Sequence, residues 1–166
     1  MSAGVYFHKA LQQEWESISN SIKHQMASRG FRASNELRNA SQLVLRGQRH
    51  GRRYIVPGTG KVTYYKRKKT AKITYTRYTA SAPGEPPAVR TGAFRMSWHP
   101  KVTVDHTNGY SVISKVESTQ RTDNGKYLLG EILEEGTGRM APRPHHQKIQ
   151  AKALPGILKI YNEPYV

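Results

Sequence analysis

The stretch between Glu36 and Glu85 contains no acidic residue, and this constrains the fold more than any other feature of the chain. The same stretch contains twelve basic residues, distributed along it: Arg38, Arg46, Arg49, Arg52, Arg53, Lys61, Lys66, Arg67, Lys68, Lys69, Lys72 and Arg77. So many unpaired charges cannot be packed in a hydrophobic core. The central part, residues 46–82, is therefore predicted to be an extension that projects into solvent or onto an acidic partner.

The extension has the composition of β-strands rather than of a helix. A turn rich in Pro and Gly is predicted at residues 57–60, and the four basic residues 66–69 are predicted to form the tip of a long hairpin. β-branched and aromatic residues, which suit strands, are concentrated in three segments: 54–56, 62–65 and 73–78.

The N-terminal part of the chain shows helical periodicity. Apolar residues recur every three or four positions from residue 5 to residue 26, so they share one face of an amphipathic helix. Trp15 is predicted to anchor this helix on a sheet, with an exposed interaction hot spot as the alternative. Gly30 is predicted to bend or break the helix, and the helical pattern resumes over residues 37–44.

The second half of the chain alternates turns with short elements. A proline-stiffened connector, residues 81–88, precedes a short element at 93–98 that Pro100 is expected to close. The Asn-Gly turn at 107–109 predicts a β-hairpin. A further turn at 123–125 leads to a short helix or edge strand at 127–135, and a terminal helix is expected over 147–161, kinked or divided by Pro155-Gly156.

These segments predict an α+β fold for the 166-residue chain: a long N-terminal helix packed on a small antiparallel β-sheet, a protruding basic β-hairpin extension and a short C-terminal helix. We expect one domain over residues 1–166, with 46–82 as its extension. No apolar run is long enough to span a membrane, and the N-terminus does not have the pattern of a secretory signal. The absence of cysteine suits folding in a reducing cytoplasm.

Few residues suggest catalysis or metal binding. Glu131 and Glu135 share a helical face like paired acid/base carboxylates, but ion pairs with neighbouring Arg or Lys are the preferred interpretation. His145-His146 and His99 are possible metal ligands, yet adjacent histidines on a regular element point apart. The segment 58–61 lacks the full phosphate-loop pattern, so it is interpreted as a turn. We therefore expect no catalytic residue, no cofactor and no metal.

Two short motifs carry a resemblance to a known family. Thr91, Gly92, Phe94, Arg95 and Ser97 match a Thr-Gly-x-Leu-Arg-x-Ser-like motif. Glu134, Gly136, Thr137, Met140 and Pro144 match a Glu-aromatic-Gly-Thr motif that leads into Met-x-x-x-Pro, although Glu135 takes the place of the aromatic residue. In this order, and followed by a C-terminal helix, they resemble the HK97 gp10-like family of virion proteins at the head-to-tail junction of tailed bacteriophages.

The resemblance implies a structural neck protein without enzymatic activity, also described as a head-tail joining or tail completion protein. Such a protein assembles as a ring of six or twelve copies between the head-connector or head-closure proteins and the tail terminator or tail tube proteins. The motif residues and the Trp98 region would then lie at subunit interfaces. It implies location in the virion neck, after assembly in the host cytoplasm.

The basic extension leaves a second function open. With a formal net charge of +16, the chain is expected to attract polyanions. The residues predicted to face an acidic partner or DNA are Arg52, Arg53, Lys66, Arg67, Lys68, Lys69 and Lys72. Tyrosines interleave with these residues and can stack on bases, so the alternative is a basic nucleic-acid-binding module that acts outside the mature virion. In a neck ring the same residues would contact genomic DNA without sequence specificity.

Overall fold

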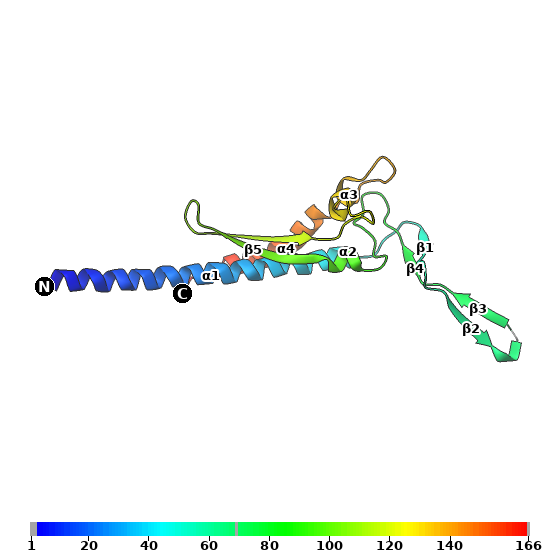
Figure 1. Ribbon diagram of the computed structural model, residues 1–166, viewed down its shortest axis with the longest axis horizontal. Coiled ribbons are helices and arrows are strands. Elements are labelled where there is room, and N and C mark those ends of the chain that lie inside the picture. Colours follow the sequence, from blue (N-terminus) through cyan, green and yellow to red (C-terminus); the bar gives the residue numbers. More distant parts are fainter. Residues whose placement is uncertain (1–2, 69, 166) are drawn as a thin grey trace.

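The computed structural model describes the backbone of residues 3–68 and 70–165, and the side chains of residues 9–67 and 70–165. The fold is α+β, as predicted. Helix α1 (Ala3–Arg46) is 44 residues long and gives the molecule its elongated shape (Figure 1). At 1.5 Å per residue such a helix extends over about 65 Å. The other elements gather on its second half, and the N-terminal half projects beyond them.

The body of the molecule consists of α1, one β-hairpin and the terminal helix. Strands β5 (Trp98–Asp105) and β6 (Ser111–Ser118) pair antiparallel around the predicted turn at residues 107–109. The hairpin packs along α1. Helix α4 (His146–Tyr161) runs antiparallel to α1, because Gly156 lies beside Glu36 whereas Glu163 pairs with Arg32.

The core of this body is small. Its buried members are Ala40, Leu45, Trp98, Ile149 and Ala153, with Leu37, Val44, Phe94, Val116 and Ile157 packed against them. They come from α1, α2 (Ala93–Met96), β5, β6 and α4. Short helix α3 (Leu129–Glu135) lies beside this core and precedes the loop that leads into α4.

Gly30 does not break the helix, contrary to the prediction. Helix α1 is continuous through it, and its function is to allow close packing: a Cβ at this position would lie 2.4 Å from Val112 Cγ1 on β6. The hydroxyl of Ser114 also donates a hydrogen bond to the Gly30 carbonyl oxygen at 2.8 Å. The glycine therefore allows the hairpin to cross the helix at close range.

The expectation for Pro100 was wrong, and so was one of the two alternatives for Pro155, a divided helix. Pro100 lies inside β5, paired with Val116, and does not end the element before it. Because β5 has β6 as its single neighbour among the described strands, a residue without an N–H is tolerated there. Pro155 lies inside α4, which runs as one helix from His146 to Tyr161 instead of as two pieces.

Residues 50–82 form a projection that we call the arm. It contains β1 (Arg53–Ile55), β2 (Lys61–Tyr65), the 3₁₀ turn Lys66–Lys68, β3 (Thr70–Thr74) and β4 (Arg77–Thr79). The predicted hairpin is confirmed, with β1 paired to β4 and β2 to β3. Its tip lies at Lys66–Lys68, as expected, and Lys69 lies outside the described residues. The segment predicted as one strand over 73–78 is divided between β3 and β4 at Tyr75-Thr76.

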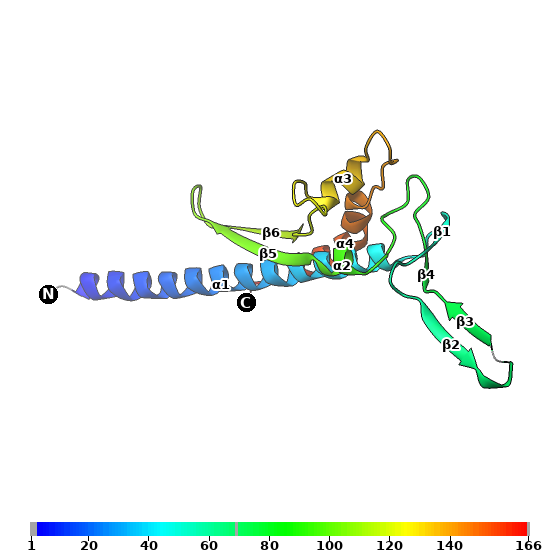
Figure 2. The same ribbon diagram turned by 45° about the vertical axis from the view of Figure 1, so that its right-hand side comes forward.

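The prediction that Trp15 anchors α1 on a sheet is wrong. Its side chain is 73% exposed, and Leu11, Ile18 and Ile22 on the same face are exposed as well. The β5–β6 turn reaches α1 only as far as Lys23, whose carbonyl oxygen accepts a hydrogen bond from the Tyr110 hydroxyl at 3.1 Å. Figures 1 and 2 agree that no other element accompanies the helix farther toward its N-terminus. Over the described residues, no helix combines the length and the apolar character that a membrane span requires.

Candidate functional site

The two sequence motifs, about forty residues apart in the chain, line one cleft. Thr91, Gly92, Phe94 and Arg95 form one wall, and Met140 comes from the other motif. Apolar side chains from α1 and α3, among them Leu45, Leu129 and Leu133, also line it, and the cleft has a volume of about 630 Å³. Arg95 makes no ion pair within the described part of the chain, so the wall carries a cation with no acidic partner of its own.

The residues of the first motif shape the start of α2 and join it to the sheet. Gly92 has φ 87°, a left-handed conformation that glycine adopts at little cost, and the Thr91 hydroxyl accepts a hydrogen bond from the Ala93 amide. Ser97 Oγ donates to the Phe94 carbonyl oxygen at 2.8 Å and lies 2.7 Å from Ser118 Oγ on β6. The motif therefore sets the direction in which the chain enters β5.

The second motif forms a tight turn between α3 and α4. Gly136 has φ 79°, and a Cβ there would lie 2.6 Å from the Met140 carbonyl oxygen, so the turn requires glycine. Thr137 and Met140 exchange backbone hydrogen bonds of 2.8 and 3.1 Å. Pro144 follows and precedes the residue at which α4 begins. The second motif thus forms a specific loop held by its own backbone.

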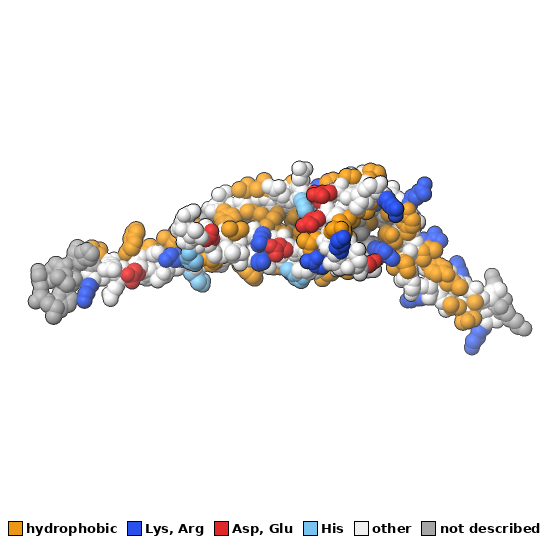
Figure 3. Space-filling view, turned by 45° about the horizontal axis from the view of Figure 1, so that its top comes forward, with side chains coloured by type: hydrophobic (Ala, Val, Ile, Leu, Met, Phe, Trp, Pro, Cys, Tyr) orange, Lys and Arg blue, Asp and Glu red, His pale blue; other side chains and the backbone are white. Residues whose placement is uncertain are grey.

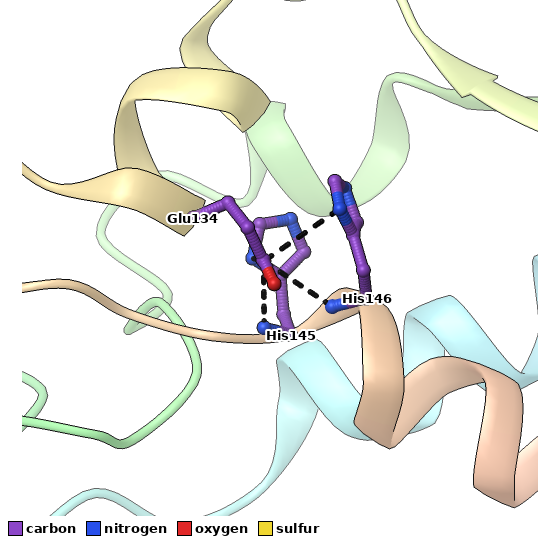
Figure 4. Close-up of side chains that lie close together, drawn as sticks. All are labelled: Glu134, His145 and His146. Atoms are coloured by element: carbon purple, nitrogen blue, oxygen red, sulfur yellow. Dashed lines mark hydrogen bonds and ion pairs between the residues drawn. The ribbon is translucent and has the colours of Figure 1, made fainter.

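Glu134 holds this loop against the start of α4 (Figure 4). Its Oε2 atom accepts hydrogen bonds from the backbone amides of His145 and His146, at 2.8 and 3.2 Å, and lies 2.7 Å from His145 Nδ1. A carboxylate supplied by α3 therefore caps the N-terminus of α4, where free N–H groups favour a negative charge. The sequence motif identified Glu134 but not this capping role.

The adjacent histidines do not point apart, as the sequence reasoning assumed. Their ring centroids lie 4.5 Å from each other, and both rings face Glu134. The reason is that His145 has φ −135°, outside the helical region, so the alternation expected on a regular element does not apply. His145 is completely buried, and its ring packs edge-on against Phe94 and Trp98, with centroids 5.7 Å apart in both pairs.

The hydrogen bonds of His145 place a proton on Nδ1. Nδ1 lies between two acceptors, the Glu134 carboxylate and the Arg143 carbonyl oxygen at 3.1 Å, so Nδ1 carries the proton. Burial lowers the pKa of His145, and the opposing effect of these two acceptors is smaller. Burial is the largest single effect and raises the pKa of Glu134, but the amide hydrogen bonds from His145 and His146 and the electrostatic interactions with the two rings together bring that pKa below its usual range.

Glu134, His145 and His146 together resemble a metal site, since one ligand atom of each lies within 4.8 Å of the others. The hydrogen bonds argue for a structural role. A metal on His145 Nδ1 would replace the proton shared with Glu134 and Arg143, and it would leave an N–H on Nε2, a buried atom without a hydrogen-bond partner among the described residues. The cluster is therefore best explained as a junction between α3 and α4.

The other candidate residues lie apart from this junction. Glu131 and Glu135 are exposed on α3, and the ion pairs expected for them do not form within the described chain. His99 is exposed on β5 and does not belong to the histidine cluster. Residues 57–60 form the predicted turn, in which the Thr59 hydroxyl donates to the Val56 carbonyl oxygen.

The cations of the arm face solvent. Arg52, Arg53, Lys66, Arg67 and Lys72 are exposed and form no ion pair or side-chain hydrogen bond with a described residue. The side chain of Lys68 and all of Lys69 lie outside the described residues. The space-filling view shows basic side chains along the arm beside a band of hydrophobic atoms (Figure 3).

Two residues that the sequence reasoning did not single out hold the base of the arm. Glu85 accepts hydrogen bonds from the backbone amides of His50 and Ala82, where the chain enters and leaves the arm, and its Oε1 lies 2.5 Å from His50 Nδ1. The hydrogen bonds from the His50 ring, the Ala82 amide and the His50 amide lower the pKa of Glu85 to about 2. The Arg49 side chain donates to the carbonyl oxygens of Val44 and Pro87, which joins the end of α1 to the connector.

Comparisons of the chain with protein-family models, with curated proteins and with solved structures found no match.

Proposed function

We propose that this protein is a structural component of the neck of a tailed phage, assembled as a ring that joins the head connector to the tail around the DNA path. The observation that carries the proposal is the arm, which is fastened at its base by Glu85 and Arg49 and uncovered along its length. The body makes few contacts that would stabilise the arm, so the arm is suited to contact another molecule. The order of the two motifs and their resemblance to the HK97 gp10-like family support the same conclusion.

In this function the body is a rigid support and carries no catalytic group. The Glu134 junction and the Gly136 turn fix α3 and α4 relative to the sheet, so the cleft between the motifs keeps its shape. Arg95 in that cleft and the arm cations are the groups available to acidic surfaces of neighbouring subunits or of adjoining rings. Zones of opposite charge favour docking in one orientation.

Quantitative mass spectrometry of purified tailed particles tests this proposal. We expect the chain to be present at a fixed ratio to the portal protein, either half or equal, which corresponds to six or twelve copies. Its absence from mature particles would contradict a neck function and would leave an assembly factor or a nucleic-acid-binding protein.

The arm tip gives a sharper prediction. Replacing Lys66, Arg67, Lys68 and Lys69 together by Ser should leave thermal unfolding unchanged, because Lys66 and Arg67, the two whose side chains are described, are exposed, but should weaken docking in particle assembly. A control with four exposed cations of the body replaced by Ser (Lys9, Arg46, Arg139 and Lys152) makes the same change in net charge. Equal docking by the two variants would contradict a specific function of the tip.

The unpaired cations of the arm also support the second candidate, a nucleic-acid-binding module that acts outside the virion. The purified chain would then bind DNA without any virion partner, and the affinity would fall steeply with salt because bound counterions are released from the phosphates. Reversing the charge of residues 66–69 should abolish this affinity. Weak binding at physiological salt would leave the neck function as the better explanation.

A further inference from the structure

The outer ribbon of the arm, β2 with β3, has two chemically different faces. The register pairs Val62 with Ile73 and Tyr64 with Ala71, and because side chains alternate along a strand these four lie on one face. We call it the apolar face of the arm. The other face carries polar and basic residues with one tyrosine: Lys61, Thr63, Tyr65, Thr70, Lys72 and Thr74.

The apolar face is uncovered. Val62 and Ile73 are about half exposed, and Tyr64 is 77% exposed. At the base of this face Gly60 leaves room for an aromatic ring, since a Cβ there would lie 3.1 Å from Tyr75 Cε1. A two-stranded ribbon is at best marginally stable alone in water, so a surface of this kind gains stability when another apolar surface covers it.

A second uncovered apolar surface lies at the other end of the molecule. Leu11, Trp15, Ile18 and Ile22 follow each other at intervals of four, three and four, so they form one stripe on the projecting half of α1. The α1 stripe leads into a groove of about 220 Å³ between α1 and Tyr110, which Trp15, Ile18 and Ile22 also line. Arm and stripe lie at opposite ends of the long axis in Figure 1, so they do not meet within one molecule.

The charges select among the ways in which two copies can cover these surfaces. The arm contains nine Lys and Arg residues and no acidic residue, so pairing of one arm with another would bring like charges together. The α1 stripe is bordered by Glu14, four residues before Ile18, and this carboxylate forms no ion pair with a described residue. An arm placed on a stripe joins a basic element to one of lower charge and covers both apolar surfaces.

We propose that the apolar face of the arm binds the α1 stripe of a second copy of this chain. Val62, Tyr64 and Ile73 pack against Trp15 and its neighbours, and Tyr64, the most exposed of them, enters the groove beside Tyr110. The contact is head-to-tail, because the two copies contribute different surfaces. Each copy keeps one free arm and one free stripe, and a repeated contact of this kind closes into a ring or continues as a filament.

Disulfide crosslinking between single-cysteine variants tests this contact, because the 166-residue chain has no cysteine of its own. Ile73→Cys and Ile18→Cys are prepared separately, mixed in equal amounts and oxidised. The expected product is the mixed dimer, well above the amount of either homodimer. Ile73→Cys homodimers in excess would indicate arm-to-arm pairing, and Ile18→Cys homodimers in excess would indicate helix-to-helix pairing. A random 1:2:1 ratio of Ile73→Cys homodimer, mixed dimer and Ile18→Cys homodimer, or no crosslinked product, would also overturn the proposal.

Matched controls use the opposite face of each element. Thr63→Cys lies on the basic face of the same ribbon, and Asn20→Cys lies about half a turn from the stripe on α1. Mixed with Ile18→Cys and Ile73→Cys respectively, each should give at least about tenfold less mixed dimer. Circular dichroism of every variant verifies that the exposed substitutions leave the fold intact.

This inference deepens the proposed neck function, but the two can fail separately. The crosslinking experiment depends on association between copies and can be done without the virion. Mass spectrometry of particles depends on incorporation into the virion, whichever surfaces the copies use to contact each other. A mixed dimer from a chain that is absent from particles would retain the head-to-tail contact and reject the neck function. Recovery in particles without the mixed dimer would reject the arm-to-stripe contact alone.

Discussion

At Gly30 the absence of a side chain decides how closely α1 and the β5–β6 hairpin approach. Gly30→Ala should destabilise the protein by about 1–3 kcal/mol, because Val112 and the Ser114 hydrogen bond have to move. Alanine has the better helix propensity, so a loss of stability identifies the close contact as its cause. Urea unfolding measures it, with Ser28→Ala, an exposed substitution in the same helix, as a control expected to change stability by less than about 0.5 kcal/mol.

The buried His145 should make stability depend on pH. Its pKa in the folded protein is below the ordinary value of 6.5, so between the two values the unfolded chain binds more protons than the folded one. The stability is therefore complete above pH 6.5 and is lost as the pH falls through the folded-state pKa.

Unfolding free energies at pH 7.5 and pH 5.5 measure this dependence. His145→Asn keeps a donor toward Glu134 and Arg143 but does not titrate, so the difference between the two pH values should shrink. An unchanged difference would show that other groups cause it. Since Asn also loses the ring contacts with Phe94 and Trp98, its overall stability should be lower, and the pH dependence is the informative measurement.

At the residue scale, local patterns identified positions more reliably than roles. The second motif identified Gly136, and in the structure this glycine has a positive φ, which glycine adopts at little cost. The pairing of His145 with His146 was missed because the rule for regular helices was applied to a residue that precedes the helix. The role of Glu85 at the base of the arm was not predicted, because its partner His50 lies 35 residues away in sequence and no local pattern indicates such a contact.

At the scale of elements, β composition and turn residues were sufficient to predict the arm and the β5–β6 hairpin. The continuity of α4 through Pro155 has a structural reason. Proline leaves the carbonyl oxygen of Ala151 without its helical partner, but Ala151 is exposed and water can take that place. The packing of Ile149, Ala153 and Ile160 on both sides of the proline then holds α4 as one helix.

The base of the arm gives a prediction at this scale. Glu85→Ala removes the acceptor shared by the His50 and Ala82 amides, so the arm should open more often where it joins the body. Limited trypsin digestion at neutral pH should cleave after Arg52 or Arg53 faster than in the unchanged protein. Glu131→Ala, which removes an exposed glutamate from α3, should not alter the rate.

For the whole molecule, periodicity predicted which face of α1 is apolar but not what covers it. Trp15 has the pattern of a core residue, yet the sheet that would bury it ends near Lys23. How far a hairpin extends along a helix depends on strand length and packing angle, which the helix sequence does not contain. The class of fold followed from the sequence, whereas the length of uncovered helix did not.

The division between body and arm predicts that the body folds without the outer arm. Replacing residues 57–76 by two glycines retains β1 and β4 and should shift the melting temperature by less than about 4 °C, because no core residue is removed. By contrast, Trp98→Ala should cost about 3–5 kcal/mol, since it opens the core between Phe94 and His145. Thermal unfolding of both variants makes the comparison, and a large loss on removing the outer arm would contradict an independent body.

Side chains alternate between the two faces of the outer ribbon, and this alternation limits how the arm can change in length. Deleting one residue from β2 would exchange its faces, so that Lys61 and Thr63 would take the place of Val62 and Tyr64. Deleting two residues from each strand would shorten the arm and keep the faces as they are. Variants of this protein with longer or shorter arms should therefore differ in steps of two residues per strand, because a step of one residue in both strands would keep their pairing but turn the apolar face to the opposite side of the arm.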